Sequence, residues 1–290
     1  MSTRIRPGRI HRRALRVLGG AAALAVVPGV IAVQPATASP CYGDCKPGVA
    51  RVGAGVLRLD APVGLNDQIT VAGSGGTFTI TDPVATLTAG DGCTLVNPHQ
   101  ARCTSSDVIT YLRVRGLDGD DTITNATGLI GELQGGDGND RLTGGTAADT
   151  LVGGFGADVL QGGGGSDTAS YSDVASRAAV RADLDGAAGD DGGPEDGAAG
   201  ARDTIASDVE NLEGTLQSDA LTGNAGPNVI SSGSGGADRI QGLGGNDTLT
   251  GTGGGTLDGG AATDHCTSDL RLFNSPPDAF TGCETTEILH

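Results

Sequence analysis

Residues 135–170 consist of four consecutive nine-residue repeats whose period does not slip. They read GGDGNDRLT, GGTAADTLV, GGFGADVLQ and GGGGSDTAS. Every copy opens with two glycines and has a small or aliphatic residue at its eighth place. The sixth place is always aspartate: Asp140, Asp149, Asp158 and Asp167. Repetition at a fixed short period is typical of a solenoid, in which each repeat contributes one structural unit.

The residue types divide each repeat into a turn and a strand. Paired glycines adopt backbone angles that are closed to other residues, so the first six residues are expected to form a turn. The last three residues alternate between faces in a strand, which leaves only the eighth-place side chain pointing inward. Two repeats per coil would stack these side chains between two parallel sheets. The sequence therefore predicts an all-β fold, a parallel β-roll.

The sixth-place aspartates return to the same edge of such a roll every eighteen residues. Asp140 and Asp158 keep this separation, as do Asp149 and Asp167. Stacked carboxylates repel each other unless a cation lies between them, and a cage of carboxylate and carbonyl oxygens suits calcium. The repeat contains neither sulfur nor imidazole, which argues against zinc or copper. The pattern predicts several bound calcium ions.

The pattern GGxGxDxUx, with U a large aliphatic residue, resembles the calcium-binding nonapeptide of the RTX, or haemolysin-type, proteins, which form a parallel β-roll. The resemblance implies that calcium lies between turns, held by two sixth-place aspartates and by turn carbonyls. It implies metal-binding positions in the four copies at Gly135, Asp137, Asp140, Gly144, Asp149, Gly153, Gly156, Asp158, Gly162, Gly164 and Asp167. A glycine-rich flexible linker, the alternative, would not keep Asp and Leu in register.

Less regular copies lie on both sides of the four. The copy GLDGDDTIT brings Asp121 into register, but a ten-residue turn places it 19 rather than 18 residues before Asp140. A second array follows, in which Asn228 and Gly255 occupy aspartate places. Its candidate metal-binding residues are Asp219, Asp238, Gly242, Gly244, Asp247 and Asp264. We expect fewer or weaker calcium sites there, centred on Asp238 and Asp247.

The repeats divide the chain into six segments. They are a signal peptide (1–38), an irregular N-terminal β cap (39–115), the first array (116–170), a spacer of wider coils with an acidic loop (171–213), the second array (214–264) and a C-terminal cap (265–290). Alternating apolar residues in the N-terminal cap predict strands at Gly55–Leu59, Gln68–Ala72, Thr77–Thr81 and Val108–Val114. The acidic loop is expected to be mobile. The tail is expected to fold back over the end of the roll.

Residues 1–38 have the features of an export signal. Six arginines precede an apolar run, and Ala36-Thr37-Ala38 is a small-residue cleavage site. The apolar run is short and is broken by Pro28, so no stable membrane anchor is expected. The chain is expected to be secreted after cleavage near Ala38, by either the Sec or the twin-arginine route.

The six cysteines suit an oxidising compartment. They form three close pairs in the sequence: Cys41 and Cys45, Cys93 and Cys103, Cys266 and Cys283. Local pairing is the simplest of the fifteen possible connectivities. Cys93 and Cys103 are expected to join a hairpin in the N-terminal cap, and Cys266 and Cys283 to pin the tail.

Charge and absent motifs restrict the function. The formal net charge is −17, and it becomes −23 (12 basic against 35 acidic residues) without residues 1–38, which argues against nucleic-acid binding. Neither HExxH nor GxSxG occurs, which disfavours a metalloprotease and a lipase. The sequence predicts a secreted calcium-binding β-roll without catalysis, in which calcium drives folding outside the cell.

Two alternatives stay open. One is a hydrolase or carbohydrate-active β-solenoid, which needs paired carboxylates away from the repeat edge. Asp60, Asp67 and Asp82 in the cap are the few candidates for such a pair. The other is a cell-surface adhesin that binds a surface glycan or a protein partner.

Overall fold

The computed structural model describes residues 47–290 apart from 173–177 and 272–274. These residues belong by their contacts to one unit, Ala38–His290. They form β-strands, turns and one short 3₁₀-helix, η1 (Pro194–Asp196), which agrees with the predicted all-β class. Within the described part of the chain, no helix is long and apolar enough to cross a membrane. The proposed signal peptide and the pair Cys41 and Cys45 lie outside the described residues.

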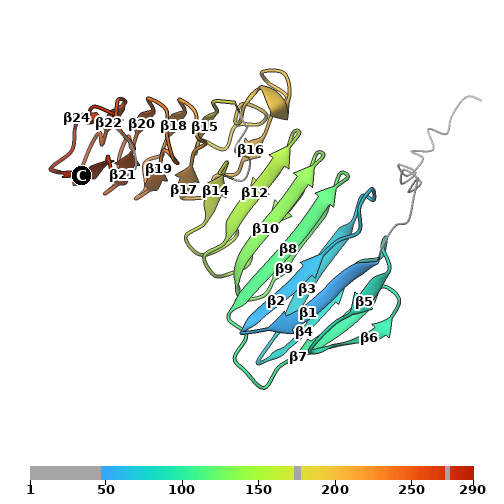
Figure 1. Ribbon diagram of the computed structural model, residues 1–290. Helices are drawn as coiled ribbons and strands as arrows, with labels where there is room; N and C mark the ends of the chain where they lie inside the picture. Colours follow the sequence, from blue (N-terminus) through green and yellow to red (C-terminus); the bar gives the residue numbers. More distant parts are fainter. Residues whose placement is uncertain (1–46, 173–177, 272–274) are drawn as a thin grey trace, which may run out of the picture. The chain divides into compact units, whose positions relative to one another are not determined.

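The strands form three sheets, and Figure 1 labels strands of each. Sheet A has 12 strands in the order β25 (Thr285–Leu289), β23 (His265–Asp269), β21 (Thr248–Gly251), β19 (Val229–Ser231), β17 (Asn211–Glu213), β14 (Thr168–Ser170), β12 (Thr150–Phe155), β10 (Ile130–Asp137), β8 (Tyr111–Asp118), β2 (Val56–Asp60), β1 (Gly48–Gly53) and β5 (Leu87–Ala89). Sheet B has eight in the order β16 (Thr204–Ile205), β13 (Val159–Gln161), β11 (Arg141–Thr143), β9 (Thr122–Ala126), β3 (Gln68–Ser74), β4 (Thr77–Thr81), β7 (Gln100–Thr104) and β6 (Cys93–Asn97). Sheet C has five in the order β15 (Arg181–Asp183), β18 (Ala220–Thr222), β20 (Arg239–Gln241), β22 (Thr256–Asp258) and β24 (Ala279–Thr281). Sheet A runs through both arrays, whereas its counterpart is divided into B and C at the spacer.

The last three residues of each regular repeat form a strand where the sequence predicts one. However, β10 and β12 run on into the predicted turns, where Gly136 pairs with Gly154 and Asp137 with Phe155, because the glycines let the backbones of successive coils approach. The seventh to ninth residues of each copy lie in β11, β12, β13 and β14. Successive copies alternate between sheets B and A, so strands 18 residues apart pair in parallel, with Arg141 beside Val159 and Thr150 beside Thr168. Two repeats therefore make one coil of the roll.

The eighth-place side chains form the core of the roll. Leu142, Leu151, Leu160 and Ala169 are each at most 1% exposed. Leu142 lies beside Leu160, and Leu151 beside Ala169, in neighbouring strands. The second array continues the same positions with Leu221, Ile230, Ile240, Leu249 and Leu257, all buried in one cluster with the first. This is the aliphatic ladder that the repeat pattern predicts.

The N-terminal cap is joined to the roll as its first coil. Its hairpins, such as β1–β2 and β3–β4, are antiparallel, but β2 pairs in parallel with β8 and β3 with β9. The strand predicted at Thr77–Thr81 is β4, and those predicted from Gly55 and Gln68 match β2 and β3 closely. The strand predicted from Val108 begins only at Tyr111. The Cys93–Cys103 disulfide joins β6 to β7, as expected.

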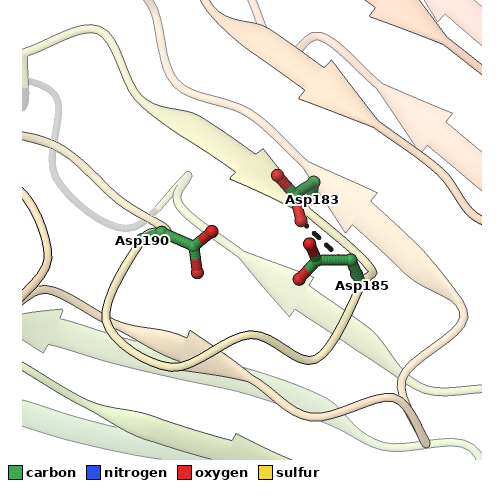
Figure 2. A group of neighbouring side chains, drawn as sticks. All are labelled: Asp183, Asp185 and Asp190. Carbon is green, nitrogen blue, oxygen red and sulfur yellow. Dashed lines mark hydrogen bonds between the residues drawn. The ribbon is translucent and has the colours of Figure 1, made fainter.

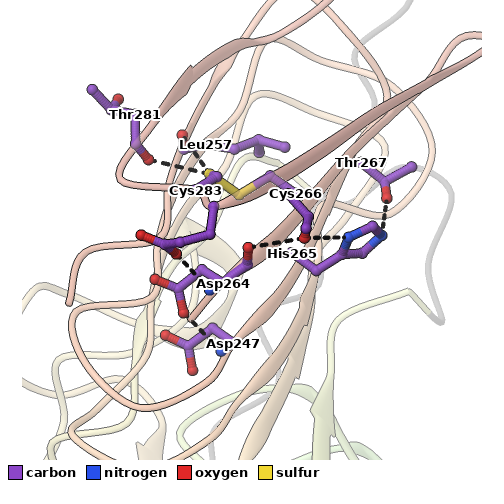
Figure 3. The surroundings of a disulfide bond; sticks show 10 residues. Asp247, Leu257, Asp264, His265, Cys266, Thr267, Thr281 and Cys283 are labelled. Atoms are coloured by element: carbon purple, nitrogen blue, oxygen red, sulfur yellow. Dashed lines mark hydrogen bonds between the residues drawn. A yellow bond between two sulfur atoms is a disulfide. The ribbon is translucent and has the colours of Figure 1, made fainter. Parts of the chain in front are cut away.

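The tail does not fold back over the roll. Instead, β24 pairs in parallel with β22, and β25 pairs in parallel with β23, so residues 279–289 add one more coil. The tail can do this because Phe280 packs against the buried core at the position held by Leu257 in the coil before. The predicted Cys266–Cys283 disulfide is present and joins this last coil to β23 (Figure 3).

The spacer continues the roll with wider coils. Five of its side chains are buried in the core cluster: Tyr171, Val180, Leu184, Ile205 and Leu212. The acidic loop between β15 and β16 contains η1 and two isolated bridges, one of them between Asp191 and Asp203. Its mobility stays a prediction.

Candidate metal sites

Every sixth-place residue lies directly before a strand, so these residues form one column along the edge of each sheet. The first column precedes strands of sheet B and contains Asp67, Asp121, Asp140, Asp158 and Asp203. The second precedes strands of sheet A and contains Asp149, Asp167, Glu210, Asn228, Asp247, Asp264 and Glu284. The third precedes strands of sheet C and contains Asp219, Asp238, Gly255 and Asp278.

The first column is a chain of hydrogen bonds between coils. The backbone N–H of each aspartate donates to Oδ1 of the aspartate one coil later. Asp67 donates to Asp121, Asp121 to Asp140 and Asp140 to Asp158, each at 2.7 Å, and Asp158 donates to Asp203 at 2.9 Å. Asp121 and Asp140 are 19 rather than 18 residues apart, yet they form the same hydrogen bond as the other pairs. All five side chains are at most 2% exposed.

In three aspartates of each of the first two columns, the other carboxylate oxygen is buried and has no hydrogen-bond partner among the described residues. This holds for Oδ2 of Asp121, Asp140 and Asp158 in the first column. It also holds for Oδ2 of Asp167, Asp247 and Asp264 in the second. A buried anionic oxygen is costly unless a proton or a cation lies beside it.

The first-place glycines leave room for these oxygens. A Cβ added to Gly135 would lie 2.1 Å from Asp140 Oδ2 and 2.5 Å from the carbonyl oxygen of Gly153. In other copies, a Cβ added to the first-place glycine would also lie close to the carboxylate of its own repeat, at 2.2–2.7 Å. These glycines are Gly144, Gly153, Gly162 and Gly242. Glycine at the first place therefore brings carboxylate and carbonyl oxygens together on one side of the turn.

Burial raises the pKa of three carboxyl groups in the middle of the first column far above the usual range of aspartate. The pKa rises to about 8 for Asp121, about 7 for Asp140 and about 9 for Asp158. Loss of solvation is the largest cause in each case, and neighbouring carboxylates add to it. The exposed Asp137 is one of these neighbours of Asp140 and does not belong to the column.

The second column has the same links but is less uniform. Asp149 donates to Asp167 Oδ1 at 2.8 Å, and Asp247 donates to Asp264 Oδ1 at 2.8 Å. Burial raises the pKa of Asp167 to about 6 and also raises the pKa of Asp247. Asp149 differs, because both of its oxygens accept hydrogen bonds, Oδ1 from Gly131 N–H and Oδ2 from Gly145 N–H. Figure 3 shows Asp247 and Asp264 next to the terminal disulfide.

The third column offers fewer free oxygens. Both oxygens of Asp219 accept hydrogen bonds, from Val180 N–H and from Thr215. Asp238 Oδ1 accepts a hydrogen bond from Asp219 N–H at 2.9 Å, and burial raises the pKa of Asp238 to about 6. Gly255 stands at the next aspartate place, as the sequence indicates, and supplies no carboxylate.

Two of the glycines named from the sequence lie away from these contacts. Gly164 and Gly244 are third-place residues, and the nearest atoms to an added Cβ are 3.9 and 4.0 Å away. The fourth-place glycine is the constrained one: Gly156 has φ +117°, and its Cβ would lie 1.9 Å from the carbonyl oxygen of Gly138. Gly165 and Gly245 hold this place in their repeats and were not predicted.

Five column members were not predicted from the sequence: Asp67, Asp203, Glu210, Asp278 and Glu284. A signal exists for two of them, because Asn66–Thr70 (NDQIT) and Arg202–Ala206 (RDTIA) keep the second half of the repeat, xDxUx, without its glycines. The signal is not specific, since Ser106–Thr110 (SDVIT) fits it equally well and its Asp107 is exposed.

A separate acidic group lies in the spacer (Figure 2). Oxygens of Asp183, Asp185 and Asp190 lie within 4.8 Å of one another, and no other group of three such ligands is this close within the described residues. Asp185 and Asp190 are exposed and Asp183 is half-buried. Water can solvate these carboxylates, so they require a cation less than the buried columns do.

The repeat arrays match a known family. Residues 134–169, 213–235 and 232–255 match the model described as RTX calcium-binding nonapeptide repeat (4 copies). These segments are RTX repeats. A search of curated proteins finds no match to the chain.

The residues of the RTX repeats fit calcium by their chemistry. The donor set consists of carboxylate and carbonyl oxygens only, which is the set that calcium prefers. The six partnerless Oδ2 atoms of the first and second columns are buried beside first-place glycines or their equivalents. The columns continue beyond the matched RTX repeats, to Asp67 on one side and Glu284 on the other.

The paired carboxylates that a hydrolase would need are not accessible in the cap. Asp67 and Asp82 are both 0% exposed, so neither can reach a bound substrate. Asp60 forms an ion pair with Arg51, with a separation of 3.0 Å between Asp60 Oδ2 and an Arg51 nitrogen. These residues give no support to a glycosidase site in the cap.

Proposed function

We propose that this calcium-binding repeat protein is secreted, has no catalytic activity, and folds and becomes stable when calcium binds to its columns. One observation supports the proposal most strongly: six aspartate oxygens in the first and second columns are buried with no hydrogen-bond partner among the residues that the structure describes. At neutral pH these groups must either carry a buried negative charge or take up a proton, and both oppose folding of the metal-free chain. Bound calcium supplies the compensating positive charge, so that binding free energy becomes folding free energy.

The proposed ligands are side chains and carbonyls that the roll brings together. They are Asp121, Asp140 and Asp158 in the first column and Asp167, Asp247 and Asp264 in the second. Carbonyl oxygens of first-place glycines, such as Gly153 beside Asp140, lie on the same side of the turn. Asp149 and Asp219 are weaker candidates, because hydrogen bonds already satisfy both of their oxygens.

Secretion is supported by two features. Residues 1–38 combine arginines, an apolar run and a small-residue cleavage site. The disulfides Cys93–Cys103 and Cys266–Cys283 are typical of proteins in oxidising compartments. Extracellular calcium is millimolar, which would saturate sites with a dissociation constant of roughly 10⁻⁴ to 10⁻³ M.

A calcium titration tests the proposal. The purified chain starts in chelator, far-ultraviolet circular dichroism follows the β content, and calorimetry counts the ions. We expect a cooperative gain of β structure on adding calcium. The double variant Asp140→Asn/Asp158→Asn should bind fewer ions and require more calcium for the same change.

A matched control removes two exposed carboxylates instead. Asp91→Asn/Asp107→Asn changes the net charge equally, lies in the cap and leaves the columns intact. It should titrate as the unmodified chain does. A chain that has full β structure in chelator and does not respond to calcium contradicts the proposal.

A further inference from the structure

Asp67 is the first residue of the first column, and no donor in the described part of the chain reaches its carboxylate. Its own N–H donates to Asp121 Oδ1 at 2.7 Å, which fixes the residue to the first coil. The side chain is 0% exposed, and neither Oδ1 nor Oδ2 has a hydrogen-bond partner within residues 47–290 as far as the structure describes them. Asp67 therefore buries a carboxylate with both oxygens unsatisfied.

A second fully buried carboxylate faces it. Asp82 follows directly after β4, is 0% exposed, and lies within hydrogen-bonding reach of the Asp67 carboxyl group. Its Oδ1 accepts from the N–H groups of Val84 at 3.0 Å and Ala85 at 3.2 Å, whereas its Oδ2 has no partner. The pair thus presents three unpartnered oxygens, all inside the cap.

The charges around the pair are negative. Asp118 acts on Asp67 electrostatically as a third carboxylate, and its Oδ1 accepts from Gly64 N–H. The nearby imidazole of His99 is engaged elsewhere, because its Nδ1 contacts the backbone carbonyl oxygens of Asp82 and Ala85 at 3.1 and 2.7 Å. Two carboxylates buried in contact repel each other, and only a cation or a shared proton removes that cost.

We propose that Asp67 and Asp82 bind a divalent cation of the calcium class, which joins the N-terminal cap to the first coil of the roll. Oxygen-only donors favour a hard cation of this kind, and backbone carbonyls and water complete its usual set of six to eight oxygens. The site differs in construction from the columns, since its ligands precede and follow a single hairpin, β3–β4, rather than lying on successive coils.

The site lies outside the RTX repeats, which match within residues 134–255. It rests on the proposed function for the choice of calcium as the ion. Its added role is to stabilise the cap: the bound cation fixes the hairpin β3–β4 and the loop after β4.

Ion counting tests the site. Native mass spectrometry of the full chain in calcium gives the number of ions for the unmodified protein, for Asp67→Asn and for Asp82→Asn. We expect each variant to bind one calcium ion fewer while the remaining ions stay. Asp107→Asn is the matched control, because Asp107 lies in the cap within the same five-residue pattern as Asp67 but is exposed, and it should keep the full count.

The outcomes separate this site from the proposed function. An unmodified chain that binds no calcium contradicts both. A chain that binds calcium with the same count and affinity in Asp67→Asn and Asp82→Asn overturns the cap site alone, and indicates that the two carboxyl groups share a proton.

A measurement on the unmodified chain covers the case in which the variants misfold. Hydrogen exchange of the segment from residue 64 to residue 86 is followed as calcium is added. The amides of Val84 and Ala85, which donate to Asp82, should exchange about tenfold more slowly or better once the site is filled. Exchange that stays unchanged here while the RTX repeats become protected overturns the proposal.

Discussion

The two oxygens of a column aspartate have different surroundings, and Asp140 shows why this matters for a single substitution. Its Oδ1 accepts from the backbone of Asp121, and its Oδ2 has no partner. Replacing the carboxylate by an amide of the same shape keeps the acceptor and removes the buried charge. The effect of such a substitution should therefore depend on whether calcium is present.

The effect of Asp140→Asn on the free energy of unfolding should have opposite signs in chelator and in calcium. In chelator at pH 7.5 we expect the free energy of unfolding to stay equal or rise, because a buried charge has been removed. In saturating calcium it should fall by about 2 kcal/mol or more, the effect of losing one ion at roughly a hundred times its dissociation constant. Urea unfolding in both buffers measures this. Equal destabilisation in the two buffers would argue against a ligand role for Asp140.

Asp149→Asn is the contrasting variant. Both Asp149 oxygens accept backbone N–H groups, from Gly131 and Gly145, so an amide nitrogen would face a donor. We expect a loss of about 1–3 kcal/mol with and without calcium, the cost of an unsatisfied buried group. The same urea experiments distinguish the two aspartates. A loss confined to the calcium buffer would contradict this assignment.

Two glycine substitutions test whether the close contact between the first-place glycine and the column carboxylate matters for stability. In Gly135→Ala the new methyl group would lie 2.1 Å from Asp140 Oδ2, so the turn must shift, at a cost of about 1–3 kcal/mol. In Gly164→Ala the nearest atom is 3.9 Å away, so little change is expected. Thermal unfolding in calcium compares them. Equal midpoints for the two variants would show that the first-place contact has no energetic importance.

At the scale of a column, the raised pKa values predict how the metal-free roll responds to pH. The pKa values of Asp121, Asp140 and Asp158 are about 8, 7 and 9 when folded, against about 3.9 for an unfolded aspartate. Between about pH 4 and pH 9 the folded metal-free chain therefore binds more protons than the unfolded chain. The stability that these three groups contribute is fully present below about pH 4 and is lost as the pH rises through about 7–9.

The expected result is a melting temperature in chelator that falls from pH 5 to pH 9. In calcium the trend should reverse over the acidic part of this range, because protons compete with the cation for the same oxygens. Asp140→Asn/Asp158→Asn should flatten the chelator profile. A chelator profile that is flat or rising in the unmodified chain would refute the link between column burial and stability.

The last coil depends on its disulfide. Cys283→Ala keeps the buried Cys266 in the core but removes the covalent link between β23 and the residues before β25. A bridge that closes a loop of this length contributes about 3 kcal/mol. Because coils contact only their neighbours, the loss should be local. Hydrogen exchange should quicken in residues 279–289 and stay unchanged in 220–250; a uniform change along the chain would contradict this.

The strands of the arrays could be predicted from the sequence because the repeat fixes their place. In each copy the glycines and the eighth-place aliphatic residue mark the turn and the buried position without reference to the rest of the chain. The tail was predicted wrongly, since residues 279–289 carry no glycine pairs and yet form β24 and β25. Their pairing is decided by the open edge of the coil before them, which the sequence of the tail does not reveal.

The ends of the columns could not be predicted for a related reason. Asp67 and Asp121 are separated by 54 residues, and the segment between them has no repeat to set their register. The five-residue pattern around Asp67 also occurs around Asp107, which is exposed. Asp67 directly precedes β3, which pairs with β9, whereas Asp107 directly precedes no strand, and the pairing of β3 depends on contacts distant in the sequence.

For the whole roll, the arrangement of the sheets predicts the result of cutting the chain once. Residues 197–201 of the spacer loop are exposed and include Ala198 and Ala199, which elastase can cleave. Upstream β14 pairs with downstream β17, and upstream β13 with downstream β16. The two fragments should therefore elute together in calcium and separate only in urea. Separation in calcium without denaturant would show that these pairings are weak.

The interval between linked column residues is not constant along the roll. It is 18 residues from Asp140 to Asp158, 19 from Asp219 to Asp238 and 17 from Asp247 to Asp264, with the same backbone-to-carboxylate contact each time. Single-residue insertions and deletions in the turns are thus absorbed within one coil. Adding a single nine-residue repeat is different, because it would move every later strand to the opposite sheet. Genes for such rolls should therefore lengthen or shorten by an even number of repeats.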